Sequence, residues 1–152
     1  ITGHSGFVGK NFIKTNLNKY NFNLYNDSLE INSDIVLHLA GKAHDIKKVS
    51  DINEYYNTNT ELTKNVYNAF LISKAKVFIT LSSVKAVADN LDYELKEDEF
   101  PNPITDYGKS KLLAEQFIFS QTISNKKRVY VLRPCMIYGP NNKGNLNLLT
   151  KR

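Results

Sequence analysis

Apolar, strand-like runs alternate with helical stretches along this 152-residue chain, and this alternation limits its fold more than any other feature. The apolar runs lie at 34–40, 76–83 and 128–134, with a weaker one at 21–26. Apolar residues recur at helical spacing over 7–20, 52–73 and 107–122. Buried strands that alternate with helices need crossover connections, which give a parallel sheet covered by helices on both faces. The pattern therefore predicts a doubly wound α/β domain with a parallel sheet.

Three glycines, Gly3, Gly6 and Gly9 of ITGHSGFVG, stand at every third position before the first helical stretch. In such a strand–helix junction the first glycine permits a tight turn. The second lets the backbone approach a pyrophosphate, and the third allows close packing of helix on sheet. Amide groups at the helix start then face the anion. We predict a dinucleotide cofactor here, with Ser5, Phe7 and Val8 as further contacts; the alternative is a tight turn that binds nothing.

The choice between NAD and NADP depends on the end of the second strand, about 20 residues after the glycine loop. Asp27 and Glu30 lie in this region, and it contains no arginine. A carboxylate there accepts hydrogen bonds from a ribose 2′-hydroxyl and repels a 2′-phosphate. The sequence therefore favours NAD, with Asp27 as a cofactor-binding residue. The alternative is that both carboxylates are ordinary turn residues.

TDYGKSK places Tyr107 and Lys111 four residues apart, on one face of the last predicted helix. A free tyrosine, with a pKa near 10, is a poor base at neutral pH. We expect the Lys111 ammonium and a cationic nicotinamide ring both to stabilise the phenolate and to lower the pKa of Tyr107. Ser83 ends an apolar strand, so its hydroxyl should emerge at the ligand-binding edge of a parallel sheet. These three residues are the predicted catalytic group.

Other features restrict the remaining function classes. The net charge is +5, but the lysines are scattered and form no basic helix, so we expect no nucleic-acid partner. No apolar run approaches the length of a membrane span, and no His/Cys/Asp spacing suggests a metal. The single cysteine, Cys135, is interpreted as inert packing, and it fits a reducing cytoplasm. His38, in an apolar strand, is interpreted as a hydrogen-bonded core residue.

Taken together, these motifs resemble the extended short-chain dehydrogenase/reductases, and within them the NAD-dependent nucleotide-sugar epimerase/dehydratase family. The resemblance runs through ITGHSGFVG, DIVLHLAG, YYNTNTELTKNV, FITLSSVKA, PITDYGKSKLLAEQ and VLRPCMIYGPNNKGNLNLL. It implies a Rossmann fold that binds NAD, with further cofactor contacts from Leu39, Ala40, Gly41, Asn59 and Lys111. It also implies that Tyr107 is the acid/base, that Lys111 is its electrostatic partner, and that Ser83 is a hydrogen-bonding hydroxyl. Substrate contacts would come from Ser83, Tyr107 and Asn145, and the complete protein would be a homodimer.

The resemblance implies a UDP-hexose or UDP-N-acetylhexosamine 4-epimerase that acts by transient hydride abstraction. Dehydratases of this group carry an Asp-Glu pair after the serine strand, whereas Val84-Lys85 follows Ser83 here. The run 133–136 lacks the asparagine of typical UDP-galactose 4-epimerases, and LSSVK and KGN resemble a polysaccharide-pathway subgroup. One alternative is an NAD(P)H-dependent 4-keto nucleotide-sugar reductase. Another, from a different class, is a non-catalytic NAD-binding sensor or scaffold.

Both ends of the sequence suggest part of a longer protein. Two residues precede the first glycine, whereas a strand typically has about five or six. The end, NLNLLTKR, reads as the first turns of a helix without a cap. We therefore expect residues 1–140 to form an NAD-binding Rossmann domain and residues 141–152 to begin a substrate domain. The chain would then be a fragment that lacks most of its first strand and its C-terminal substrate domain.

Overall fold

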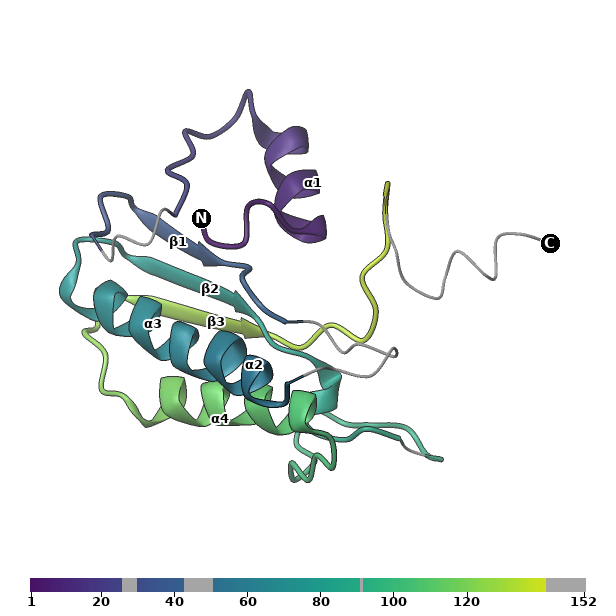
Figure 1. The fold of residues 1–152 in the computed structure, drawn as a ribbon. Coiled ribbons are helices and arrows are strands. Elements are labelled where there is room, and N and C mark those ends of the chain that lie inside the picture. The colour runs from purple at the N-terminus through teal and green to yellow at the C-terminus, as the bar shows by residue number, and fades with distance from the viewer. Residues whose placement is uncertain (26–29, 43–50, 91, 142–152) are drawn as a thin grey trace.

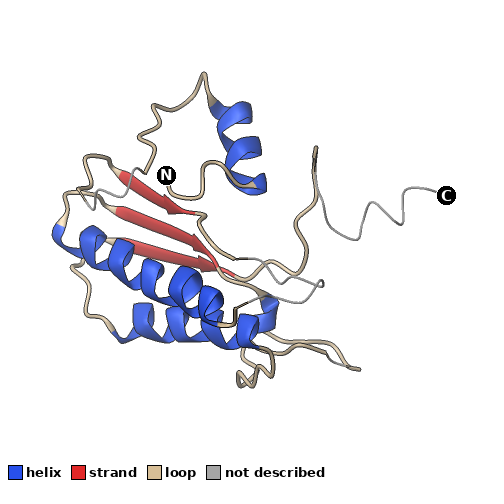
Figure 2. Ribbon diagram, viewed as in Figure 1, coloured by secondary structure: helices blue, strands red, loops and turns tan. Residues whose placement is uncertain are grey.

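A three-stranded parallel sheet lies at the centre of the computed structural model (Figures 1 and 2). The structure describes residues 1–25, 30–42, 51–90 and 92–141. The strands, in their order across the sheet, are β1 (Ile35–His38), β2 (Val77–Leu81) and β3 (Arg128–Leu132). The helices are α1 (Phe7–Asn16), α2 (Asn53–Tyr55), the π-helix η1 (Tyr56–Glu61), α3 (Leu62–Ile72), the 3-10 helix η2 (Val84–Ala86) and α4 (Asp106–Ser120). The parallel α/β arrangement predicted from the sequence is confirmed.

The residues before the glycine loop extend this sheet beyond β1. Thr2 forms an isolated parallel bridge with His38. Ile1 donates to the carbonyl oxygen of Asn23 and accepts from the N–H of Tyr25, as in a parallel ladder. Over its described residues, 21–25, the predicted weak strand is therefore extended chain beside Ile1, but it forms no regular strand. Ile1 and Thr2 lie between this chain and β1, and such a switch point is where doubly wound sheets bind ligands.

The core lies between one face of the sheet and the two long helices α3 and α4 (Figure 1). Its buried side chains are Val36, Val66, Tyr67, Phe70, Ala75, Phe78 and Ile118. Alternate strand residues point to the opposite face, where Ile35, Tyr130 and Leu132 are exposed. We expected helices on both faces. Among the described residues they cover one, because α1 lies beyond the β1 edge of the sheet (Figure 1).

The predicted helix over 52–73 changes pitch in its middle. α2 passes into the π-helix η1, which passes into α3 without a break. π-helical turns are rare and occur frequently at functional sites, and here the turn buries Asn59 and Thr60. After α3 ends at Ile72, the Lys127 ammonium donates to the carbonyl oxygens of Phe70, Ser73 and Ala75. These bonds satisfy carbonyl oxygens at the end of α3 and in the chain just beyond it.

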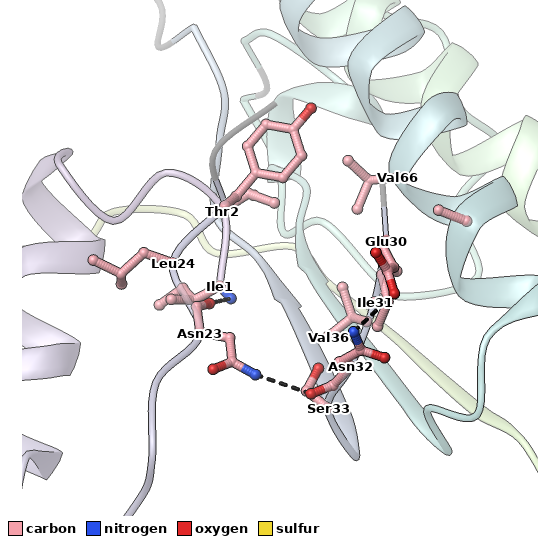
Figure 3. A pocket seen from close by; sticks show the side chains of 12 residues that line it. Ile1, Thr2, Asn23, Leu24, Glu30, Ile31, Asn32, Ser33, Val36 and Val66 are labelled. Atoms are coloured by element: carbon pink, nitrogen blue, oxygen red, sulfur yellow. Dashed lines mark hydrogen bonds between the residues drawn. The ribbon is translucent and has the colours of Figure 1, made fainter. Parts of the chain in front are cut away.

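A small cavity of about 70 Å³ separates the extended chain around Ile1 from α3 (Figure 3). On one wall the Asn23 amide donates to the backbone oxygen of Asn32, and the Asn32 amide donates to the Glu30 carboxylate (Figure 3). This cavity has room for a few water molecules. Asp27, the predicted ribose ligand, lies outside the described residues. Among the described helices, none is long and apolar enough to cross a membrane.

Candidate active site

The glycine loop is pressed against the chain that follows β1. Gly3 has a φ of +64°, and a Cβ there would overlap the backbone of Leu39 and Ala40. Residues other than glycine rarely adopt this φ. The Thr2 hydroxyl accepts the N–H of Ala40 at 3.1 Å. Two segments that the sequence assigned to the cofactor, the loop and residues 39–41, are therefore in contact.

Helix α1 presents its N-terminus beside this loop without a side-chain cap. Gly6 is the N-cap residue, and no described side chain accepts a hydrogen bond from the first turn. Ser5 and Gly6 are exposed, while Phe7 and Val8 are half-buried. A Cβ on Gly6 would meet the carbonyl oxygen of Gly3 at 3.3 Å, and its outer side is open. Uncapped amides at the positive end of a helix dipole suit an anion, so this loop fits a dinucleotide pyrophosphate.

Gly9 makes a different contact from the one expected. A Cβ at this position would overlap the carbonyl oxygen of Gly3 and come within 2.8 Å of the His4 Cα. The helix therefore packs on its own loop, whereas the sequence predicted that Gly9 would let it pack on the sheet. The reason is that the loop folds back against the first turn of α1.

Asn59 connects the chain after β1 to helix α4. Its side-chain oxygen accepts the N–H of Lys42, and its side-chain nitrogen donates to the Lys42 carbonyl and the Ser110 hydroxyl. Asn59 is 1% exposed, so its polar atoms serve these internal bonds. A Cβ on the adjacent Gly41 would come within 3.1 Å of the Lys111 ammonium nitrogen. Gly41 and Asn59, both predicted cofactor contacts, thus form the surroundings of Lys111.

Ser83 and Tyr107 meet at the carboxyl end of the sheet. The Ser83 hydroxyl hydrogen-bonds the Tyr107 phenol, and its oxygen accepts the N–H of Lys85 at 3.2 Å. The two residues meet because Gly108 allows α4 to approach the chain after β2: a Cβ on Gly108 would overlap the Lys85 carbonyl oxygen. A glycine inside a helix costs about 1 kcal/mol relative to alanine. Its occurrence directly after Tyr107 was the signal that could have revealed this contact.

Lys111 follows Tyr107 by one helical turn and is 8% exposed. Its ammonium donates to the carbonyl oxygen of Leu81 at 3.0 Å. Burial lowers the pKa of Lys111 to about 8, although the nearby Glu115 carboxylate raises it. Lys111 is therefore still mostly charged at pH 7, but it gives up its proton far more readily than a lysine in water.

The pKa of Tyr107 differs from the sequence-based expectation. Burial raises this pKa, the hydrogen bond from Ser83 lowers it, and the neighbouring Tyr55 raises it, leaving a value above the ordinary one. We had expected Lys111 to lower it. The Tyr55 ring lies edge-on to the Tyr107 ring, with centroids 5.9 Å apart, and contributes to this burial. At neutral pH Tyr107 is consequently a neutral phenol, able to donate a proton.

An open cleft of about 210 Å³ runs beside Tyr107 and Lys111. Leu39 and Gly41 line the side that follows β1, and the run 134–137 lines the side beyond β3. Cys135 belongs to this run and is exposed. The interpretation of Cys135 as inert packing is therefore wrong, because β3 ends before the chain reaches it. Asn145, the predicted substrate contact, lies outside the described residues.

His38 behaves as a hydrogen-bonded core residue, as expected. Its Nδ1 pairs with the Thr2 hydroxyl and its Nε2 with the Thr63 hydroxyl, both at 2.8 Å. Thr63 donates its proton to the carbonyl oxygen of Asn59, so His38 Nε2 carries a proton and Nδ1 accepts from Thr2. Burial, with the positive charge of Lys111 as a smaller cause, lowers the pKa of His38 to about 3. A neutral His38 thus joins Thr2, just before the glycine loop, to Thr63 at the start of α3.

A glycine loop beside an uncapped helix start, a Ser–Tyr hydrogen bond and a buried lysine one turn later lie at the carboxyl end of the sheet, and the comparisons with known proteins identify the family. A family model described as the NAD dependent epimerase/dehydratase family matches residues 23–151. The chain belongs to this family. The match begins after the glycine loop and includes β1, β2, β3 and the Tyr107 helix.

Relatives in the epimerase/dehydratase family are similar over most of the chain. A UDP-glucose 4-epimerase from Vibrio cholerae is 31% identical over 79% of the chain and 38% of its own length. An N-acetyl-alpha-D-glucosaminyl-diphospho-ditrans,octacis-undecaprenol 4-epimerase from Escherichia coli O157:H7 is 31% identical over 78% of the chain and 36% of its own length. The crystal structure of a UDP-N-acetylglucosamine 4-epimerase from Bacillus cereus superposes with a TM-score of 0.75. It is 25% identical over 97% of the chain and 58% of its own length. The chain thus spans less than two fifths of these two curated relatives.

Proposed function

We propose that the complete protein is an NAD-dependent 4-epimerase of a UDP-hexose or UDP-N-acetylhexosamine. The observation that carries this proposal is the hydrogen bond between Ser83 and Tyr107 in a cleft that also contains Lys111. The cleft borders the 39–41 chain against which the glycine loop packs. A sugar in the cleft would thus lie between a proton-exchanging tyrosine and a cofactor cradle.

NAD fits the residues that are present. The uncapped start of α1 and the open side of Gly6 would hold its pyrophosphate. Leu39, Ala40 and Gly41 would lie along it, and Asp27 would accept from the adenosine ribose. When bound, NAD supplies a hydride acceptor that can return the hydride to either face of the sugar.

The chain's own residues would manage the proton. Tyr107 would exchange a proton with the sugar's 4-oxygen, and Ser83 would hydrogen-bond the same oxygen and keep it beside the phenol. The positive charge of Lys111, one turn along α4, favours the phenolate whenever Tyr107 has given up its proton. Asn145 would contact the nucleotide sugar. The raised pKa of Tyr107 makes the neutral phenol its resting form, so substrate and cofactor must lower this pKa on binding.

The proposal extends to the assembly and location of the complete protein. A homodimer would form through the helices that contain Asn59 and Tyr107, and Leu113 and Phe119 on α4 are exposed there. The relative that is named for an undecaprenol-linked sugar supports a role in polysaccharide biosynthesis. We also propose that the protein is located in the cytoplasm. Size-exclusion chromatography with light scattering is expected to give twice the mass of one chain; a monomer would contradict the dimer.

The function is tested by incubating the complete protein with UDP- and dTDP-sugars, with and without NADH. The proposal predicts conversion of a UDP-sugar to its 4-epimer without added NADH. Reduction of a 4-keto sugar that depends on added NADH would identify a reductase instead. Tight NAD binding without turnover of any sugar in the panel would favour a sensor or scaffold. Either of these two results contradicts the proposed epimerase.

A further inference from the structure

Helix α4 buries a second charged group close to Lys111. Glu115 follows Lys111 by four residues, so both side chains project from the same face of the helix. Glu115 is 2% exposed, and a buried carboxylate is costly unless it is paired. Its partner is Arg133, directly after β3, whose Nε donates to both carboxylate oxygens at 3.0 and 3.1 Å. Arg133 Nη2 makes a further bond to Glu115. The pair ties the middle of α4 to the start of the cleft wall at 134–137.

Glu115 and Lys111 also face a common small space. A cavity of about 10 Å³ is lined by both residues and by Ser82. This space has room for about one water molecule, so bulk solvent does not screen the attraction between the two charges. The Ser82 hydroxyl is buried and has no hydrogen-bond partner among the described residues. Glu115 is therefore a charged neighbour of Lys111 inside the protein, rather than a surface residue.

The charged and titratable groups around Lys111 come from three directions. Tyr107 and Glu115 share α4 with it, His38 faces it from β1, and Arg133 lies beyond β3. Burial keeps His38 neutral, and Arg133 carries a positive charge. Among the described groups that face Lys111, Glu115 thus supplies the negative charge.

We propose that Glu115 is a positioning residue that, held by Arg133, fixes the Lys111 ammonium beside Tyr107 and balances its charge. An ammonium has three donors and a flexible stem. The Leu81 carbonyl holds the Lys111 ammonium by a hydrogen bond, and the charge of Glu115, which lines the same small space, attracts it from within α4. Arg133 fixes that carboxylate from the chain directly after β3. This inference rests on the proposed function, because Lys111 acts in catalysis through Tyr107.

The test compares Glu115→Gln with Glu61→Gln, the same change at an exposed residue of η1 that pairs with Lys64. NMR of labelled lysine in the complete protein measures the pKa of Lys111, with its signal assigned by Lys111→Met. Glu115→Gln is expected to lower this pKa by about one unit, because a nearby negative charge is lost. Arg133→Gln is expected to raise it, because the carboxylate then acts on Lys111 alone. Glu61→Gln leaves it unchanged.

Turnover gives the second readout. In Glu115→Gln the alkaline limb of kcat moves to lower pH by about one unit, while KM changes by less than about twofold. Glu115→Asp keeps the charge and is expected to restore the position of this limb. Circular dichroism checks that each variant is folded, since removing one partner of a buried ion pair is destabilising.

The proposal is overturned if the pKa of Lys111 is the same in folded Glu115→Gln or Arg133→Gln as in the wild type. That result would give the ion pair a role in stability alone. If Glu115→Gln does not fold, the test rests on Arg133→Gln: a raised pKa of Lys111 supports the proposal, and a lowered pKa overturns it. The NMR measurement of the Lys111 pKa requires no turnover. A wild-type protein without epimerase activity would therefore refute the proposed function, and the NMR measurement would still test the role of Glu115.

Discussion

Gly108 lies so close to Lys85 that a Cβ on the glycine would overlap the lysine's carbonyl oxygen. This contact sets the first turn of α4 against the chain that carries Ser83. Because Tyr107 directly precedes Gly108, the distance between the two hydroxyls of the site depends on the missing Cβ. A further hydrogen bond, from Tyr56 to Asp106 at 2.8 Å, ties the same turn to η1.

Gly108→Ala is therefore expected to reduce turnover strongly, by tenfold or more, by pushing Tyr107 away from Ser83. Helix propensity alone would favour alanine by about 1 kcal/mol, so a loss would point to the contact with Lys85. Gly139→Ala is the matched control, since a Cβ there would meet the Phe7 ring at an ordinary 3.6 Å. Steady-state kinetics compare the two. Full activity in Gly108→Ala would show that this contact does not set the catalytic geometry.

The glycine loop predicts two different effects of the same substitution. Gly9→Ala is expected to destabilise the protein, because a Cβ there overlaps the backbone of Gly3. Gly6→Ala has more room, with its nearest atom at 3.3 Å, but its Cβ would stand where a pyrophosphate approaches. Gly6→Ala should therefore keep the melting temperature within a few degrees and weaken NAD binding about tenfold or more. Calorimetry measures both quantities, and unchanged NAD affinity in Gly6→Ala would contradict the cradle.

His38 makes stability depend on pH. Its pKa is about 3 when folded and 6.5 in the reference state. Between these values the unfolded chain binds a proton that the folded protein excludes, so stability falls as the pH drops below about 6.5. From pH 7 to pH 5 this amounts to about 2 kcal/mol. Urea denaturation should show that His38→Gln loses less stability over this range than the wild type. Equal losses would mean that His38 is not held neutral.

Lys127 is expected to stabilise the end of α3. Its ammonium donates to the carbonyl oxygens of Phe70, Ser73 and Ala75, and it lies 4.3 Å from the Phe70 ring centroid. Lys127→Met should lower the free energy of unfolding by about 1–2 kcal/mol through lost charge-assisted hydrogen bonds. Lys126→Met, a neighbouring change of the same type, should cost less than about 0.5 kcal/mol. Chemical denaturation measures the free energy of unfolding of both variants. Equal losses would show that the Lys127 hydrogen bonds do not stabilise the end of α3.

The parallel sheet could be predicted because its strands are short apolar runs with local signals. Each observed strand lies inside an apolar run that was predicted to be a strand: Ile35–His38, Val77–Leu81 and Arg128–Leu132. The described part of the predicted strand, 21–25, forms hydrogen bonds with Ile1 but no regular strand. A strand forms only when it pairs with a neighbouring strand, and the local sequence pattern does not show whether that neighbour is there.

The internal geometry of the site depended on contacts that sequence spacing does not reveal. The π-helix at Asn59 is tied to α4 through the hydroxyl of Thr60, which donates to the Ser110 carbonyl oxygen at 2.8 Å. The pKa of Tyr107 depends on its burial, and spacing alone suggested the influence of Lys111 instead. Residue types at i and i+4 thus indicated which groups share a face, but not how much water surrounds them.

The central claim, that Tyr107 exchanges the proton of the reaction, is tested most directly by the turnover of Tyr107→Phe in the complete protein. The variant is compared with Tyr130→Phe, which makes the same change at an exposed position of β3. We predict that kcat for the converted UDP-sugar falls about a hundredfold or more in Tyr107→Phe. NAD affinity should stay within about threefold, and Tyr130→Phe should keep the wild-type kcat. A Tyr107→Phe protein that turns over the sugar at the wild-type rate would contradict the account.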